Sequence, residues 1–231
     1  MAAPRVYGVA APILSEDALA AALDTLARKD PSIAAMRAAA GAPPLRRRDA
    51  GLAGLIWIVV GQQVSTAAAN AIYARFSTAF PGFEADALAA AAPEALAACG
   101  LSRPKIRTVR ALAQAVRDGA LDFAALAAMP ADEAHAALCA VHGVGPWSAD
   151  IFLLFCLGCA DAFPAGDLAL QEAARLALGL RARPDARRLE KIAERWRPLR
   201  AVAARLLWAY YRVARNRDGM ALAAASAGEA S

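Results

Sequence analysis

Residues 141–167 read VHGVGPWSADIFLLFCLGCADAFPAGD and hold the two features that decide the fold of this chain. Gly143 and Gly145 form a short turn between two segments with helical periodicity, and Asp167 closes the stretch before a further helical segment. Glycine takes positive φ at little steric cost, and Pro146 fits the first position of a helix. Backbone amides at such a helix start form a typical site for a phosphate group. We therefore expect a hairpin of two helices that holds a phosphate, although a turn with glycines for packing alone remains an alternative.

The size and composition of the chain favour a domain without membrane contact. At 231 residues the chain suits one sizeable domain, or two lobes that share a core. Alanine inflates the hydrophobic fraction of 59%, and the longest apolar runs, 52–60 and 151–160, are too short to span a bilayer. The N-terminal residues lack the charged and then apolar pattern of a signal peptide, so we expect a cytoplasmic protein.

The charge distribution favours a polyanionic partner. The net charge is +5, and residues 181–217 contain eleven arginines and one lysine against three acidic residues. A basic region of this kind is typical of a protein that binds nucleic acid. A solvated, arginine-rich surface is the alternative.

The four cysteines predict no metal site. Cys156 and Cys159 have CxxC spacing, but they lie in an apolar run, and no second pair or suitably spaced histidines follow. We expect buried, unreactive thiols.

The periodicity predicts an all-α fold. Apolar residues recur at intervals of three and four through most of the chain, with long uninterrupted segments at 14–39 and 52–80. The breaks contain glycine and proline, and no segment alternates as a strand would. We expect about ten short helices within residues 1–215 and a flexible tail at 216–231.

Several separated segments resemble one family. The GQQVS sequence at 61–65 is similar to the Gly-Gln-x-Val/Leu-Ser motif of alkylpurine DNA glycosylases. The hairpin and the sequence FPAGD at 163–167 resemble the helix-hairpin-helix and Gly/Pro-rich-then-Asp motif of the wider base-excision glycosylase superfamily. Residues 100–105 and 196–208 resemble parts of the same alkylpurine branch. Over residues 52–212 the chain thus resembles the helix-hairpin-helix/GPD superfamily, in its DNA-3-methyladenine glycosylase II (AlkA-like) branch.

The resemblance implies a two-lobed, all-α glycosylase domain with a cleft between the lobes and no N-terminal β domain. The hairpin motif would lie at about 132–158. The chain departs from the family where Val141 and His142 replace the usual Leu-Pro of the hairpin. No cysteine follows Cys159, so no iron–sulfur cluster is expected, which leaves a monovalent cation at the hairpin as the one ion to consider. A monomer is the default for such an enzyme.

The resemblance assigns the catalytic role to Asp167. An ionised carboxylate stabilises the positive charge that develops on a sugar as its base leaves, and it can orient the attacking water. The other interpretation of Asp167 is an N-cap of the following helix, and the two roles are compatible. Trp147 stands where bifunctional relatives carry a nucleophilic lysine, so the resemblance implies a monofunctional enzyme that uses water.

The same resemblance predicts a pocket for the damaged base. The residues at the pocket positions of the alkylpurine branch are Trp147, Ile151, Leu168 and Trp208. Indole faces attract cations, and an alkylated purine such as 3-methyladenine or 7-methylguanine carries positive charge. The base must first be flipped out of double-stranded DNA. Core packing is the alternative role for the tryptophans.

The residues expected to contact DNA come from four segments. Gln63 falls where the family places the residue that fills the gap left by the flipped base. The complete set of expected DNA contacts is Gln62, Gln63, Ser65, Lys105, Gly143, Val144, Gly145 and Arg200. The resemblance therefore predicts a nucleoid-associated repair enzyme without a cofactor. Two alternatives stay open: a non-catalytic helix-hairpin-helix protein that binds distorted DNA, and a glycosylase for a neutral lesion such as hypoxanthine or uracil.

Overall fold

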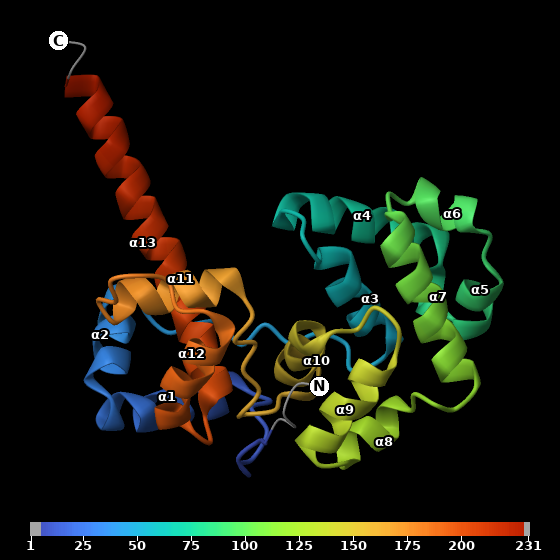
Figure 1. Cartoon of the computed structure of the whole chain (residues 1–231), viewed down its shortest axis with the longest axis horizontal. Helices are drawn as coiled ribbons and strands as arrows, with labels where there is room; N and C mark the ends of the chain where they lie inside the picture. Colours follow the sequence, from blue (N-terminus) through green and yellow to red (C-terminus); the bar gives the residue numbers. More distant parts are fainter. Residues whose placement is uncertain (1–5, 229–231) are drawn as a thin grey trace. The chain divides into compact units, whose positions relative to one another are not determined.

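The computed structural model describes the backbone of residues 6–228 and the side chains of residues 6–216. The chain forms two compact units: unit 1 comprises Met1–Tyr7 and Arg47–Ala162, and unit 2 comprises Gly8–Arg46 and Phe163–Ser231 (Figure 1). Within the described range every regular element is a helix, so the prediction of an all-α fold is confirmed. No helix among these residues is both long enough and apolar enough to cross a membrane.

Unit 1 is built around the apolar helix α3. Seven of the ten residues of α3 are buried, and this helix contacts α4, α7 and α10. The helices of unit 1 are α3 (Leu52–Gly61), α4 (Thr66–Ala79), η1 (Pro81–Phe83), α5 (Ala85–Ala90), α6 (Pro93–Ala98), α7 (Arg103–Arg117), α8 (Phe123–Ala128), α9 (Ala131–Ala140), α10 (Pro146–Phe152) and the π-helical turn η2 (Leu153–Leu157). The candidate site residues of unit 1 lie at or near the ends of α3, α7, α9 and α10.

The two long periodic segments are each two helices rather than one. Within 52–80 the chain breaks at the GQQVS loop, where Gln63 has φ 56° and Ser65 begins α4 by accepting a hydrogen bond from the Ala68 amide. Within 14–39, Asp30 ends one helix and caps the next through the Ser32 amide. The apolar periodicity runs on across both breaks, so it did not reveal them.

Unit 2 packs its helices on the first part of α13. The helices of this unit are α1 (Glu16–Lys29), α2 (Pro31–Ala40), α11 (Leu168–Ala177), α12 (Ala186–Ala193), η3 (Glu194–Trp196) and α13 (Arg200–Gly228). Helices α1, α2 and α11 all contact α13 (Figure 1). The fully buried Trp196 donates its indole N–H to Asp30 Oδ2 at 2.8 Å, which ties the start of α2 to the segment before α13.

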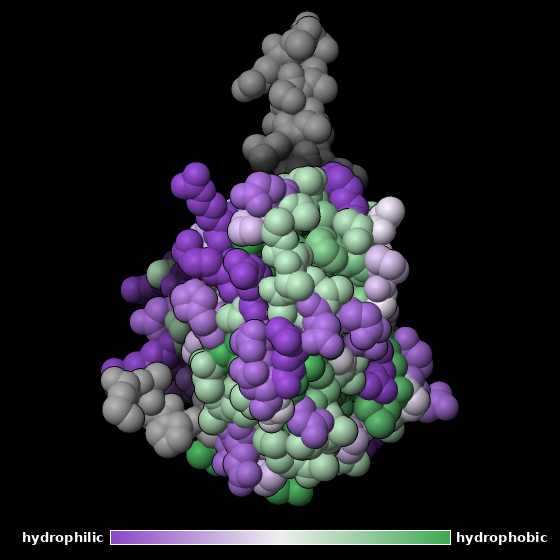
Figure 2. All heavy atoms as spheres, turned by 90° about the vertical axis from the view of Figure 1, so that its right-hand side faces the viewer, coloured by the Kyte–Doolittle hydropathy of each residue, from purple (hydrophilic) through white to green (hydrophobic). Residues whose placement is uncertain are grey.

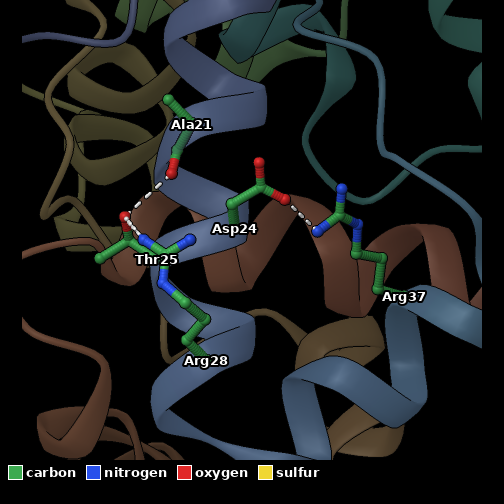
Figure 3. Close-up of polar contacts among 5 residues, drawn as sticks. All are labelled: Ala21, Asp24, Thr25, Arg28 and Arg37. Atoms are coloured by element: carbon green, nitrogen blue, oxygen red, sulfur yellow. Dashed lines mark hydrogen bonds and ion pairs between the residues drawn. The ribbon is translucent and has the colours of Figure 1, made fainter.

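A small polar network joins α1 to α2. The Arg37 guanidinium forms an ion pair with Asp24 across the two helices (Figure 3). On the same helix as Asp24, Thr25 donates its hydroxyl to the Ala21 carbonyl at 3.0 Å and accepts a hydrogen bond from Arg28 at 3.2 Å. These contacts lie at the surface and fix the local geometry of the pair.

The backbone of α13 stays helical past the point where a tail was expected. The sequence predicted a flexible segment at 216–231, whereas the helix continues to Gly228 and residues 229–231 lie outside the described range. Residues 221–226 read ALAAAS, and alanine has the highest helix propensity of all residues. A helix can therefore form there without the apolar periodicity that the prediction required.

Alanine on the surface explains the high hydrophobic fraction of the chain. Figure 2 shows the α5–α7 side of unit 1, where hydrophilic residues are interspersed with weakly hydrophobic ones. The exposed alanines of α5 and α6 are Ala87, Ala90, Ala95, Ala97 and Ala98. An exposed methyl group adds to the hydrophobic fraction without requiring a partner surface.

Candidate active site

The hairpin turn requires glycine at one of its two glycine positions. Gly143 has φ 84°, and a Cβ atom built there would lie 1.8 Å from Thr108 Oγ1. Gly145 has φ −94°, which any residue can adopt, and a Cβ atom there would meet nothing within 4 Å. The expectation of positive φ is therefore correct for Gly143 and wrong for Gly145. At Gly145, which is the N-cap of α10, the missing side chain leaves the space beside the turn open.

Val144 anchors this turn in unit 1. Its side chain is only 4% exposed, while Gly143 and Gly145 on either side are exposed. The Val144 amide donates to the Val141 carbonyl at 3.1 Å, which closes the turn after α9. The turn thus holds its backbone at the surface by burying one apolar side chain.

Gln62 connects the GQQVS loop to the hairpin. Its side-chain amide donates to Ser148 Oγ at 2.8 Å and lies 3.5 Å from the Gly143 carbonyl oxygen. The next residue, Gln63, is exposed, and Val64 is 39% exposed. The loop therefore presents Gln63 and Val64 to solvent, while Gln62 keeps the loop beside the turn.

Lys105 and Ser65 have roles inside the fold. Lys105 Nζ donates to the Val60 carbonyl at 2.8 Å, and so caps the last turn of α3. Partial burial lowers the pKa of this lysine. The Ser65 hydroxyl accepts the Ala68 N–H at 3.2 Å as the N-cap of α4. Both side chains were expected to contact DNA; that role stays a prediction, and the structure shows Lys105 bonded to α3 and Ser65 capping α4.

Asp167 lies at the start of α11 with its carboxylate held in place. Oδ1 accepts the Leu170 N–H at 2.9 Å, so the predicted N-cap is confirmed. The same oxygen also accepts the indole N–H of Trp208 at 3.2 Å. The preceding turn is fixed by a hydrogen bond from the Asp167 amide to the Pro164 carbonyl at 2.8 Å, and by Gln171, whose side chain donates to the Ala165 carbonyl at 3.0 Å.

Trp208 therefore has a contact that the sequence did not predict. It was expected to line the base pocket, and the structure places its indole N–H against the candidate catalytic carboxylate. Both residues belong to unit 2, and their positions are 41 residues apart in the chain. Leu168, the other expected pocket residue of this unit, is 63% exposed on the first turn of α11. Unit 2 thus gathers a carboxylate, an indole and an exposed leucine at one helix end.

The remaining two pocket candidates belong to unit 1. Trp147 is half-buried on the first turn of α10, and Ile151 is 4% exposed one turn later on the same helix. The spacing of four residues puts both side chains on one face of α10. Their role in binding a base stays a prediction.

A buried polar cluster supports α10 from within unit 1. Asp150 is fully buried and accepts the Tyr7 hydroxyl at 2.8 Å. His135 Nε2 lies 3.9 Å from the same Asp150 oxygen. Tyr7 and Asp150 are 143 residues apart, and nothing in the sequence pattern pairs them. This cluster fixes the helix that carries Trp147.

Two arginines of α13, Arg200 and Arg205, are buried within unit 2, although Arg200 was expected to contact DNA. Arg200 is 3% exposed, and its guanidinium lies 3.4 Å from Glu194 Oε1. Arg205 is 4% exposed and donates to the Leu45 carbonyl. This geometry does not present Arg200 to a ligand, contrary to the expectation. The sequence did contain a signal for an internal ion pair, because the acidic residue Glu194 lies six positions before Arg200.

The sequence of this chain is similar to those of DNA repair proteins. A family model described as the HhH-GPD superfamily base excision DNA repair protein matches residues 56–198. The chain is 29% identical over 166 residues to the alkylbase DNA glycosidase-like protein mag2 of Schizosaccharomyces pombe, which covers 67% of this chain and 75% of that relative. It is 37% identical over 165 residues to a probable bifunctional transcriptional activator/DNA repair enzyme AlkA of Mycobacterium tuberculosis, over 65% of this chain and 31% of that longer protein.

A solved structure agrees with these sequence relationships. The chain is similar to the 3-methyladenine DNA glycosylase Mag1 of Schizosaccharomyces pombe in complex with abasic DNA, with a TM-score of 0.76 and 27% identity. The similarity covers 81% of this chain and 95% of that one.

Proposed function

Because the chain belongs to the HhH-GPD superfamily of base excision DNA repair proteins, we propose that it is a monofunctional DNA glycosylase that removes alkylated purines from DNA by hydrolysis. The relatives named for 3-methyladenine or alkylated bases support this substrate class. The observation that carries the proposal is the Asp167 carboxylate, which is held at a helix start by one backbone and one indole N–H group.

The chemistry requires a fixed negative charge beside a sugar. As the N-glycosidic bond breaks, its electron pair leaves with the base, and positive charge develops at C1′ and the ring oxygen. The Asp167 carboxylate stabilises this charge and orients a water that adds its oxygen to C1′ and releases one proton to the solvent. An alkylated purine such as 3-methyladenine starts as a cation and leaves neutral. It therefore needs no general acid.

The lysine content of the chain supports a monofunctional reaction. Cleavage of the strand through a Schiff base requires a lysine amine that attacks C1′. The chain has three lysines, at 29, 105 and 191, and none lies in the hairpin. Trp147 occupies the second helix of the hairpin, and an indole cannot form a Schiff base. Water is then the nucleophile, and the product is an abasic site in an intact strand.

Binding of the duplex falls to the hairpin and the GQQVS loop of unit 1. Gly143 and Gly145 are exposed, and the open space beside Gly145 leaves room for a phosphate at the start of α10. Gln63 is exposed, and we propose that it enters the duplex in place of a flipped base. We propose that the enzyme acts as a monomer on the DNA of the nucleoid and needs no cofactor, with a monovalent cation at the hairpin as the one ion to test.

The proposal is tested with duplexes that each carry one defined lesion. The wild-type chain should release 3-methyladenine or 7-methylguanine and leave strands that break only after alkali treatment. Asp167→Asn keeps a side-chain oxygen for the cap but loses the charge, so it should bind the lesion duplex and release no base. Normal excision by Asp167→Asn would refute the mechanism. Binding without excision by the wild type would indicate a non-catalytic protein, and excision of only hypoxanthine or uracil would indicate a neutral-lesion enzyme.

A further inference from the structure

Unit 1 contains a cavity that the proposed reaction does not use. Its volume is about 450 Å³, which falls within the range of small-molecule sites. The lining residues are Arg47, Arg48, Asp49, Gly54, Trp57 and Tyr73. They come from the segment before α3, from α3 itself and from α4. None of these lining residues belongs to the GQQVS loop or to the hairpin turn.

Both arginines of this cavity are anchored to carbonyl groups of η2, Arg48 through its backbone amide and Arg47 through its guanidinium. The Arg48 amide donates to the Phe155 carbonyl at 2.9 Å, and Arg47 Nη2 donates to the Cys156 carbonyl at 2.9 Å. Gly54 permits this arrangement, because a Cβ atom there would lie 1.9 Å from the Asp49 carbonyl oxygen. The segment 47–49 is therefore seated closely on α3 and η2.

Arg48 is oriented for binding an anion or a planar ring. Its guanidinium carbon lies 4.3 Å from the centre of the Trp57 ring. A guanidinium that lies over an indole can still pair its N–H groups with a phosphate, because those groups lie in the guanidinium plane. Its second face is a platform on which a nucleobase can stack. The contact with Trp57 therefore holds Arg48 where a ligand that is both aromatic and anionic can meet it.

Asp49 and Tyr73 restrict the kind of ligand further. Asp49 Oδ1 accepts the Gly51 N–H at 2.8 Å and brings a carboxylate to a cavity that two guanidinium groups also line. A simple anion would be repelled by this carboxylate, whereas a ligand with its own N–H groups can donate to it. Tyr73 adds an aromatic wall, and burial together with the nearby Asp49 carboxylate raises the pKa of its phenol.

We propose that this cavity binds a purine nucleotide, with the base stacked near Arg48 and Trp57, its N–H edge toward Asp49, and its phosphate toward Arg47. Guanine is the base that fits best, because its N1–H and amino group form two adjacent donors that a carboxylate can accept together. This inference goes beyond base excision, which requires no nucleotide at this place. Its failure would leave the proposed glycosylase activity untouched.

The test is isothermal titration calorimetry of the full chain with deoxyguanosine 5′-monophosphate, deoxyadenosine 5′-monophosphate and inorganic phosphate. The guanine nucleotide should bind most tightly. Arg48→Gln should weaken this binding at least tenfold, and Asp49→Asn should reduce the preference for guanine over adenine. Arg188→Gln, which removes an exposed arginine of α12, is the matched control and should leave the binding unchanged. The melting temperature and the excision rate of Arg48→Gln should equal those of the wild type.

Four results would overturn the proposal. These are no binding of the guanine nucleotide, equal binding by Arg48→Gln and the wild type, equally tight binding of inorganic phosphate, and loss of binding in Asp167→Asn, which would place the nucleotide at the glycosylase site. A second arm uses a single-stranded oligonucleotide that begins with a 5′-phosphorylated guanosine. Binding of this strand that depends on Arg48 supports the site and assigns it to a strand end. Binding of the free nucleotide alone supports it as a nucleotide site.

Discussion

The hydrogen bond from Trp208 to Asp167 predicts that Trp208→Phe slows base release without unfolding the protein. The substitution keeps an aromatic ring on α13 and removes the N–H group that lies 3.2 Å from Asp167 Oδ1. A hydrogen bond to a charged group contributes about 1.5–3 kcal/mol. At about 1.4 kcal/mol for each factor of ten, complete loss of its orienting effect would slow the chemical step about tenfold to about 150-fold. Because the Leu170 N–H at 2.9 Å still holds the same oxygen, we expect the lower end of this range.

Single-turnover excision from a duplex with one 7-methylguanine separates this positioning role from base binding. If Trp208 positions the carboxylate, the maximal single-turnover rate falls about tenfold while the enzyme concentration at half-maximal rate changes little. Trp57→Phe, the same change at a tryptophan of unit 1, is the control and should leave the maximal rate unchanged. A Trp208→Phe rate within about twofold of the wild type would refute the reasoning. The reasoning would also be refuted if Trp208→Phe changed only the enzyme concentration at half-maximal rate, because Trp208 would then contribute to base binding alone.

Two further predictions concern stability. Gly143→Ala should lower the free energy of unfolding, measured in urea, by about 1–3 kcal/mol, because a φ of 84° is strained for alanine and the new Cβ would lie 1.8 Å from Thr108 Oγ1. Gly145→Ala is the control: the space there is open, so the free energy of unfolding should change by less than about 0.5 kcal/mol. Equal losses in both variants would contradict this account. For Asp30, burial raises the pKa, but hydrogen bonds from Trp196 and the Ser32 amide outweigh it and leave the pKa below 3.8. Asp30→Asn should therefore have a lower free energy of unfolding than the wild type at pH 7, and this difference in stability should shrink as the pH falls below 3.8. A stability difference that persists at low pH would show that the charge of Asp30 is not its cause.

Much of the local structure could be predicted from the sequence. The helical periodicity, the glycine turn before Pro146 and the N-cap at Asp167 depend on residues within a few positions of one another, and all three are present. The ends of the helices were predicted less well. The break at the GQQVS loop and the helix beyond residue 216 were missed, because apolar periodicity neither stops at a capped loop nor extends along an alanine-rich exposed helix.

The candidate site could be predicted by position but not by contact. Asp167 and Trp208 were both identified, yet their hydrogen bond was not, because it joins residues 41 positions apart. Arginine is a residue type expected to contact DNA, yet Arg200 is buried beside Glu194. Charge alone does not show whether a guanidinium faces solvent or closes the interior of a helical unit.

The sequence by itself determined the elements of the candidate site: a glycine turn between two helices, a carboxylate at a helix start, and a hairpin without lysine. These follow from backbone sterics, capping and residue identity, which act over a few residues. Only the tertiary structure decided why Gly143 must be glycine, which atom holds Asp167, and which arginines remain at the surface. Each of these depends on a partner from another helix, and the packing of the helices brings that partner within reach.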